Sequence, residues 1–151
     1  MDRFQTLLWD LGEEIQVPLH VDENHACRIV LENGIEAQLE MHLSEDELSV
    51  VAFIAELPPG CFRIDVLKEA MKENGEVRKF GRFGYIEKHN MLVLSQSLKE
   101  DQLSGPSLAN LLEVLIEEAT DWNQAISSGR NRPDGNRGRG RSSTPILPPL
   151  V

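Results

Sequence analysis

The chain has 151 residues and a net charge of −10, and 40% of its residues are hydrophobic, which is ordinary for a soluble protein. Its length suits one domain with its own core. No apolar run approaches the ~20 residues of a membrane helix, and the N-terminus lacks the features of a secretory signal. Two cysteines, Cys27 and Cys61, are too few for a disulfide-held secreted domain, so a reducing cytoplasm is expected.

Charge is distributed unevenly along the chain. Residues 130–151 hold five arginines and one acid, a net charge of +4, which leaves −14 on the first 129 residues. A strongly acidic body repels phosphate groups, so it argues against nucleic-acid binding.

The first predicted element is a helix over residues 2–16. Its apolar side chains recur at helical spacing, and Pro18 ends the element. The apolar set is Phe4, Leu7, Leu8, Leu11 and Ile15. Residues 19–26 then predict a polar connector.

Three strands are expected next, over 27–33, 36–43 and 48–57. Asn33-Gly34 is a strong hairpin signal, and the short links favour an antiparallel meander. In the second strand, apolar and polar residues alternate, which is typical of a strand with one face in a core and one in water.

The third strand breaks this alternation, because it is apolar on both faces. One face carries Val50, Ala52 and Ile54, and the other carries Val51, Phe53 and Ala55. Such a strand needs a cover on each side. The chain's own helices can supply one cover, and a partner molecule is a candidate for the other, which favours a binding protein over a catalyst.

The remaining elements complete an α+β pattern. Pro58-Pro59-Gly60 breaks the chain, and after it we predict a helix over 62–74, strands over 82–88 and 91–98, and a last helix over 106–127. The predicted fold is therefore a five-stranded antiparallel sheet in the order α-β-β-β-α-β-β-α, with helices on one face.

From Gly129 onward the composition changes to arginine, glycine and proline, which predicts a disordered tail. We expect a domain over 1–128 and a tail over 129–151. The tail could contact RNA through its arginines, or Pro145-x-x-Pro148 could bind a proline-reading domain. A solvated tail, or one that folds back on the acidic body, is the simpler interpretation.

Catalytic and metal-binding patterns are weak. Gly81-Arg-Phe-Gly84 lacks the lysine of a phosphate loop, and His20, His25 and Cys27 lack a fourth zinc ligand. The acidic residues of the last helix are expected to form its solvated side; they include Glu117, Glu118 and Asp121. We therefore expect no catalytic residues, no metal and no cofactor.

Four segments together carry a resemblance to a known family. They are the first helix (Phe4 to Gly12), the three-strand meander, the middle helix with the hairpin Phe83-Gly-Tyr-Ile and Met91-Leu-Val-Leu, and the acidic last helix from Leu108. With this element order, the chain over about residues 1–127 resembles the class I chaperones of bacterial type III secretion, the Tir chaperone (CesT/SycE-like) family.

The resemblance implies a cytoplasmic bacterial homodimer that binds the N-terminal segments of secreted effectors in extended form and keeps them secretion-competent. It implies no enzymatic activity and a separate secretion ATPase that removes the cargo. Effector binding is assigned to Phe4, Leu7, Leu8, Leu11, Val51, Phe53 and Ala55. The dimer interface is assigned to Phe62, Leu67, Met71, Tyr85 and Ile86.

Two alternatives to a secretion chaperone stay open from the sequence. The first is an adaptor or regulatory domain of related fold that binds a folded partner. The second is a small enzyme, which a metal or a cleft of perturbed carboxylates would favour. Neither a nucleic acid nor a membrane is expected as a partner.

Overall fold

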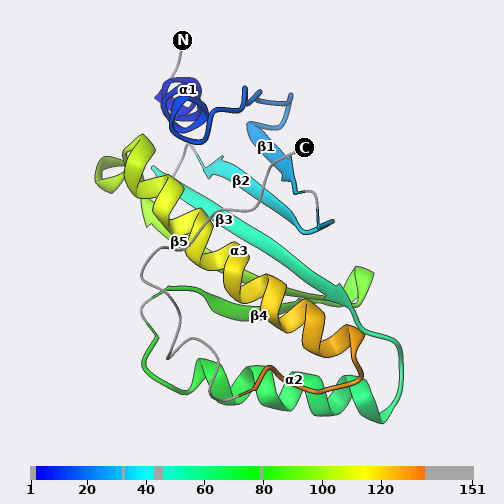
Figure 1. Cartoon of the computed structure of the whole chain (residues 1–151). Coiled ribbons are helices and arrows are strands. Elements are labelled where there is room, and N and C mark those ends of the chain that lie inside the picture. Colours follow the sequence, from blue (N-terminus) through cyan, green and yellow to red (C-terminus); the bar gives the residue numbers. More distant parts are fainter. Residues whose placement is uncertain (1–2, 32, 43–45, 79, 135–151) are drawn as a thin grey trace.

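A computed structural model of the protein describes residues 3–31, 33–42, 46–78 and 80–134 (Figure 1). The described residues confirm the predicted α+β class and the predicted order of elements. The elements are α1 (Arg3–Ile15), β1 (Ala26–Val30), β2 (Glu36–His42), β3 (Glu47–Glu56), α2 (Cys61–Asn74), β4 (Arg82–Ile86), β5 (Met91–Lys99) and α3 (Gly105–Ser127).

The five strands form one antiparallel sheet in the order β1-β2-β3-β5-β4. β1, β2 and β3 make the predicted meander. β5 then pairs with β3, which leaves β4 at one edge and β1 at the other. The register between β3 and β5 shifts between Phe53 and Ala55, as at a β-bulge.

β4 ends two residues earlier than the sequence predicts. We expected the strand to continue to Lys88, but Glu87–His89 forms a short 3-10 helix. Asn90 then adopts a left-handed conformation with φ of 53° and returns the chain into β5. Asparagine tolerates this conformation better than most residues, so the turn is placed by Asn90.

α1 and α3 cover one face of the sheet. The alternate β3 residues Val50, Ala52 and Ile54 point into this layer, and each is at most 2% exposed. α3 crosses the sheet diagonally (Figure 1). A Cβ on Gly105 would lie 2.9 Å from the backbone of Asp10, so glycine at this position allows α1 and α3 to approach closely.

α2 lies beside β4 rather than over the covered face. Only Val66 and Ala70 of this helix are buried. At its end, the Asn74 side chain accepts a hydrogen bond from Phe83 N at 2.8 Å and donates one to Phe83 O at 2.9 Å. The amide of Asn74 therefore satisfies the outward-facing backbone groups of β4 at Phe83.

Arg78 ties α2, the following loop and α3 together. Its guanidinium binds Glu73 at 3.2 Å and Glu118 at 2.6 Å, and its Nε donates to Gly81 O at 2.8 Å. The group also lies 5.0 Å from the centre of the Phe83 ring. The Arg78 side chain is only 10% exposed, so these partners replace most of its water.

This contact corrects the expectation that Glu118 belongs to a solvated acidic side of the last helix. Burial raises the pKa of the Glu118 carboxyl, while the Arg78 charge and hydrogen bond act in the opposite direction. Glu118 is thus part of the structural network that holds the α2–β4 loop.

Candidate functional site

The second face of the sheet is open in the single subunit. We call it the open face and define it by Gln38, Ser49, Val51, Phe53, Val93 and Ser95, which lie opposite one another across β2, β3 and β5. Val51, Phe53 and Ala55 are only half-buried, whereas their alternates on β3 are fully buried. No helix of this chain seals the second side of β3 in the described part of the molecule.

Polarity changes along the open face. Around Ser49 of β3 the open face is polar. Glu40 of β2 and Ser97 of β5 lie opposite Ser49, and His42 Nε2 lies 2.9 Å from Ser49 Oγ. Four residues further along β3, Phe53 stands opposite Glu36 and Val93. The apolar surface is therefore concentrated toward the end of β3.

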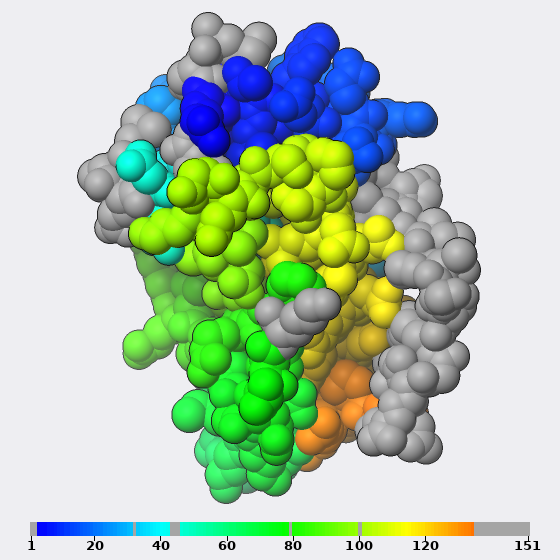
Figure 2. Space-filling view, turned by 90° about the vertical axis from the view of Figure 1, so that its left-hand side faces the viewer, coloured from blue at the N-terminus to red at the C-terminus, as the bar shows by residue number. Residues whose placement is uncertain are grey.

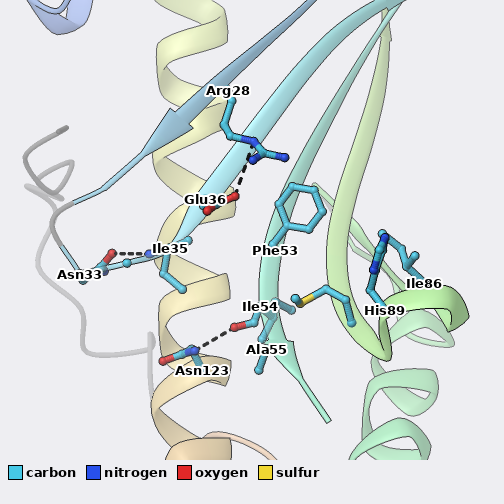
Figure 3. A pocket seen from close by; sticks show the side chains of 12 residues that line it. Arg28, Asn33, Ile35, Glu36, Phe53, Ile54, Ala55, Ile86, His89 and Asn123 are labelled. Carbon is cyan, nitrogen blue, oxygen red and sulfur yellow. Dashed lines mark hydrogen bonds and ion pairs between the residues drawn. The ribbon is translucent and has the colours of Figure 1, made fainter.

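A pocket of about 360 Å³ opens at this apolar end (Figure 3). We call it the sheet-end pocket. Its apolar lining comes from Ile35, Phe53, Ile54, Ala55, Ile86 and Met91. Its polar lining comes from Arg28, Asn33, Glu36, His89 and Asn123. The pocket thus joins residues from β1, the β1–β2 turn, β3, the β4–β5 connection and α3.

Four of the five polar side chains of the pocket are already engaged with its wall. Asn123 Nδ2 donates to Ile54 O at 2.8 Å, and Arg28 Nε lies 3.6 Å from Glu36 Oε2 (Figure 3). Asn33 Oδ1 accepts a hydrogen bond from Ile35 N at 3.1 Å. These contacts hold the polar side chains in place within the wall of the pocket. The space between them suits apolar side chains with a few polar contacts.

The β1 edge of the sheet is only partly open to pairing with an added strand. At β1, Asp22 N donates to Ala26 O, and Asp22 Oδ1 accepts from Ala26 N, so the start of this edge is closed. Hydrogen bonds from Met41 N to His25 O and from Leu31 N to Ile35 O show that the odd-numbered residues of β1 face β2. The backbone groups of Arg28 and Val30 therefore point to the outer edge.

The first-helix residues assigned to effector binding lie in the core. Phe4, Leu7, Leu8 and Leu11 are between 0% and 8% exposed. The solvent side of α1 instead presents Trp9, which is 62% exposed. Leu8 and Trp9 line a second hollow of about 390 Å³, together with Gln5, Leu19, His20 and Val21.

The residues assigned to the dimer interface lie in three different surroundings. Ile86 is half-buried and lines the sheet-end pocket. Phe62 and Leu67 are partly buried against the subunit's own core, and so is Tyr85, whose hydroxyl donates to Asn90 Oδ1 at 2.9 Å. Met71 is 70% exposed. Sequence reasoning missed Ile64, which is 53% exposed and precedes Met71 by two helical turns on the outer side of α2.

Other candidate chemistry receives little support from the geometry. Cys27 is buried, and burial raises the pKa of its thiol, so it is a poor metal ligand or nucleophile. Among the described residues, no cluster of three or more histidine, cysteine or acidic side chains could hold a metal ion. None of the described helices combines the length and apolarity needed to cross a membrane.

Comparison with known proteins shows which family model matches the chain and which solved structures share its fold. The model of the Tir chaperone protein (CesT) family matches residues 6–123. Among solved structures, a chain of the HopA1–SchA chaperone–effector complex is similar with a TM-score of 0.61 and 21% identity, over 82% of this chain and 94% of that one. A chain of the ExsC–ExsE complex has a TM-score of 0.63 and 20% identity, over 82% and 96%.

A third similar structure is that of the Yersinia pestis type III secretion chaperone SycH with a fragment of YscM2. Its TM-score is 0.59 at 18% identity, over 77% of this chain and 96% of that one. At these identities the structures establish a shared fold. No curated protein sequence matches the chain significantly.

Proposed function

Because the chain belongs to the Tir chaperone protein (CesT) family, it is a non-enzymatic type III secretion chaperone, and we propose that it holds the N-terminal segment of an effector in extended form. The observation that carries this proposal is the open apolar end of β3, where Val51, Phe53 and Ala55 are left half-buried. We place the complex in the bacterial cytoplasm, where a separate secretion ATPase removes the effector.

Two kinds of contact would hold the effector segment. Its apolar side chains enter the sheet-end pocket and cover Phe53, which gives selectivity. Its backbone pairs with the outer edge of β1 at Arg28 and Val30, which tolerates many sequences because main-chain groups are common to all of them. Both contact regions lie near Arg28, which lines the pocket and also belongs to β1.

The energetics favour an extended client with a few apolar anchors. Ordering a disordered segment costs ~2–5 kcal/mol of the gross interaction energy. Full burial of one large apolar side chain contributes about 1.5–3 kcal/mol. Two or three anchors therefore offset the ordering cost, and further contacts along the sheet set the final affinity.

Binding of isolated effector segments tests this proposal. We expect N-terminal segments of effectors from the same bacterium, which are unfolded alone, to bind with Kd values of about 1 µM or tighter in isothermal titration calorimetry. The folded C-terminal domains of the same effectors are the control and should not bind. Binding to the folded domains alone would instead support an adaptor, and binding to neither would refute the proposal.

We further propose that two copies associate through the outer side of α2, where Ile64 and Met71 are exposed. Introducing charge there by Ile64→Glu and Met71→Glu together should convert the dimer to a monomer, because two like-charged pairs would face each other across a symmetric interface. Light scattering at about 10 µM measures the mass. Val77→Glu is the matched control, since Val77 is fully exposed outside this helix face. A wild-type monomer under these conditions would refute the dimer.

A further inference from the structure

The chain continues past the family domain and turns back onto α2. The family model ends at residue 123, and α3 ends at Ser127. Gly129 has a φ of 81°, and Arg130 N donates to Ala125 O at 2.8 Å, so the chain reverses direction at this point. The segment that follows lies along α2 (Figure 1), and the end of α3 meets the same helix in the space-filling view (Figure 2).

Two ion pairs hold this returning segment. Arg132 binds Glu69 at 3.1 Å and Glu73 at 3.0 Å, one helical turn apart on α2. Residues 129–134, which the sequence assigned to a disordered tail, are therefore attached to the body. The remaining residues, 135–151, lie outside the described part of the chain and start from this fixed point.

The sheet-end pocket is within reach of these remaining residues. Asn123 lines the pocket and precedes the end of α3 by about 6 Å of helix. The six steps along the chain from Ser128 to Asp134 span at most ~20 Å, and the ten residues 135–144 span up to ~33 Å. Residues 145–151 can thus return to the pocket from the anchor at Arg132.

Charge and side-chain chemistry favour that return. The chain has a net charge of −10, and residues 135–151 contribute three arginines and no acid, so the rest of the chain carries −13. Beyond the arginines the sequence reads Pro145-Ile-Leu-Pro-Pro-Leu-Val151, which places four large apolar side chains among three prolines. Proline restricts a chain to extended conformations, so less entropy is lost when such a segment binds.

We propose that residues 145–151 occupy the sheet-end pocket of their own chain when no effector is bound, and that an effector segment displaces them. The displacement step rests on the proposed function, whereas occupation of the pocket does not. The half-buried side chains of Phe53, Ala55, Ile86 and Met91 receive the apolar side chains, and the arginine-rich linker crosses the acidic body.

The tethered segment is expected to bind the sheet-end pocket weakly. A short flexible linker gives a tethered ligand an effective concentration in the mM range. A segment with an intrinsic Kd of a few tenths of a mM therefore fills the pocket most of the time and weakens effector binding about 3- to 10-fold. Such a self-ligand raises the apparent Kd of every client by this same factor, so a tightly binding effector still fills the pocket at concentrations where a weak client no longer does.

Methyl NMR of the full chain tests occupation directly. We expect the double substitution Ile146→Asp and Leu147→Asp to shift the methyl signals of Ala55, Ile86 and Met91, while the signals of the core residues Ile29 and Ile116 stay unchanged. A synthetic peptide of residues 143–151, added to the substituted chain, should reverse the shifts. A peptide with serine at 146 and 147 is the control and should not.

The outcomes separate this inference from the proposed function. Unchanged pocket signals in the substituted chain would overturn the inference, whatever the effector does. Shifts that depend on protein concentration would also overturn it, because they would indicate exchange of the segment between two copies. If the pocket signals shift but effector segments bind neither form, self-occupation holds and the proposed function fails. If both hold, the substituted chain binds effector segments about 3- to 10-fold more tightly.

Discussion

Phe53→Asp is expected to weaken binding of an effector segment at least ~100-fold while the protein stays folded. Phe53 is half-buried on the open face, stands opposite Glu36 and Val93, and lines the sheet-end pocket. The substitution removes the largest apolar side chain of this surface and places a charge where an apolar group of the effector would lie. Burying an unpaired charge is costly, so the loss should exceed that from truncation alone.

The size of the effect follows from the contact removed. A large aromatic anchor contributes about 2 kcal/mol or more at the centre of an interface. A 100-fold loss corresponds to about 2.7 kcal/mol. Phe53→Ala, which removes the ring without adding a charge, should therefore weaken binding about 30-fold, and comparing it with Phe53→Asp separates the two contributions.

Calorimetric titration with an effector segment measures the Kd of both variants. Ser97→Asp is the matched control, because it adds the same charge to the polar part of the open face, opposite Ser49. We expect this control to bind like the wild type. Thermal melting checks that all three variants fold. Equal affinities of Phe53→Asp and the wild type for the effector segment would show that the effector does not bind at the sheet-end pocket.

Arg78→Met is expected to lower the free energy of unfolding by about 3 kcal/mol, which is a large part of the stability of a domain this size. The arginine is almost enclosed and binds two carboxylates and a carbonyl of the loop before β4. Methionine fills similar space but leaves Glu118 without its cation. The neighbouring Arg82→Met should change stability by less than about 0.5 kcal/mol, because Arg82 is exposed.

The loss in Arg78→Met should depend on pH. Burial already raises the pKa of Glu118, and without Arg78 nothing offsets that effect as strongly. A carboxyl whose pKa is higher in the folded state binds more protons there, so stability falls as the pH rises above the unfolded value of 4.5. Urea unfolding at pH 5 and pH 7 should therefore show a larger deficit at pH 7. An equal deficit at both values would show that Glu118 does not carry the cost.

Most of the secondary structure could be predicted because local signals were strong. Alternation over 36–42, the Asn33-Gly34 turn and the apolar stripes of α1 and α3 each agree with the observed elements, and residue 43 of the predicted strand lies outside the described part of the chain. Two strand ends were misjudged. β1 ends at Val30 rather than at residue 33, and β4 ends at Ile86, where polar residues form a 3-10 turn before Asn90. Such a turn has no periodic signal, so it was read as a longer strand.

The site was only partly predictable. The two apolar faces of β3 were visible in the sequence, and the structure leaves the predicted side half-buried. The sequence did not show where the apolar face of α1 packs, because an amphipathic pattern does not say whether that face meets the same subunit or a partner. The structure places it in the core of the same subunit, through Phe4, Leu7, Leu8 and Leu11. Their role in effector binding, like that of Val51, Phe53 and Ala55, stays a prediction.

By itself the sequence determined the α+β class, the order of elements and the surplus of apolar surface on β3, because hydrophobic periodicity and turn residues act over short distances along the chain. Only the tertiary structure decided that β5 inserts between β3 and β4, that Arg78 joins α2 to α3, and that five separate segments meet at one pocket. Those features depend on contacts between residues far apart in the chain, and the packing of the whole core selects them.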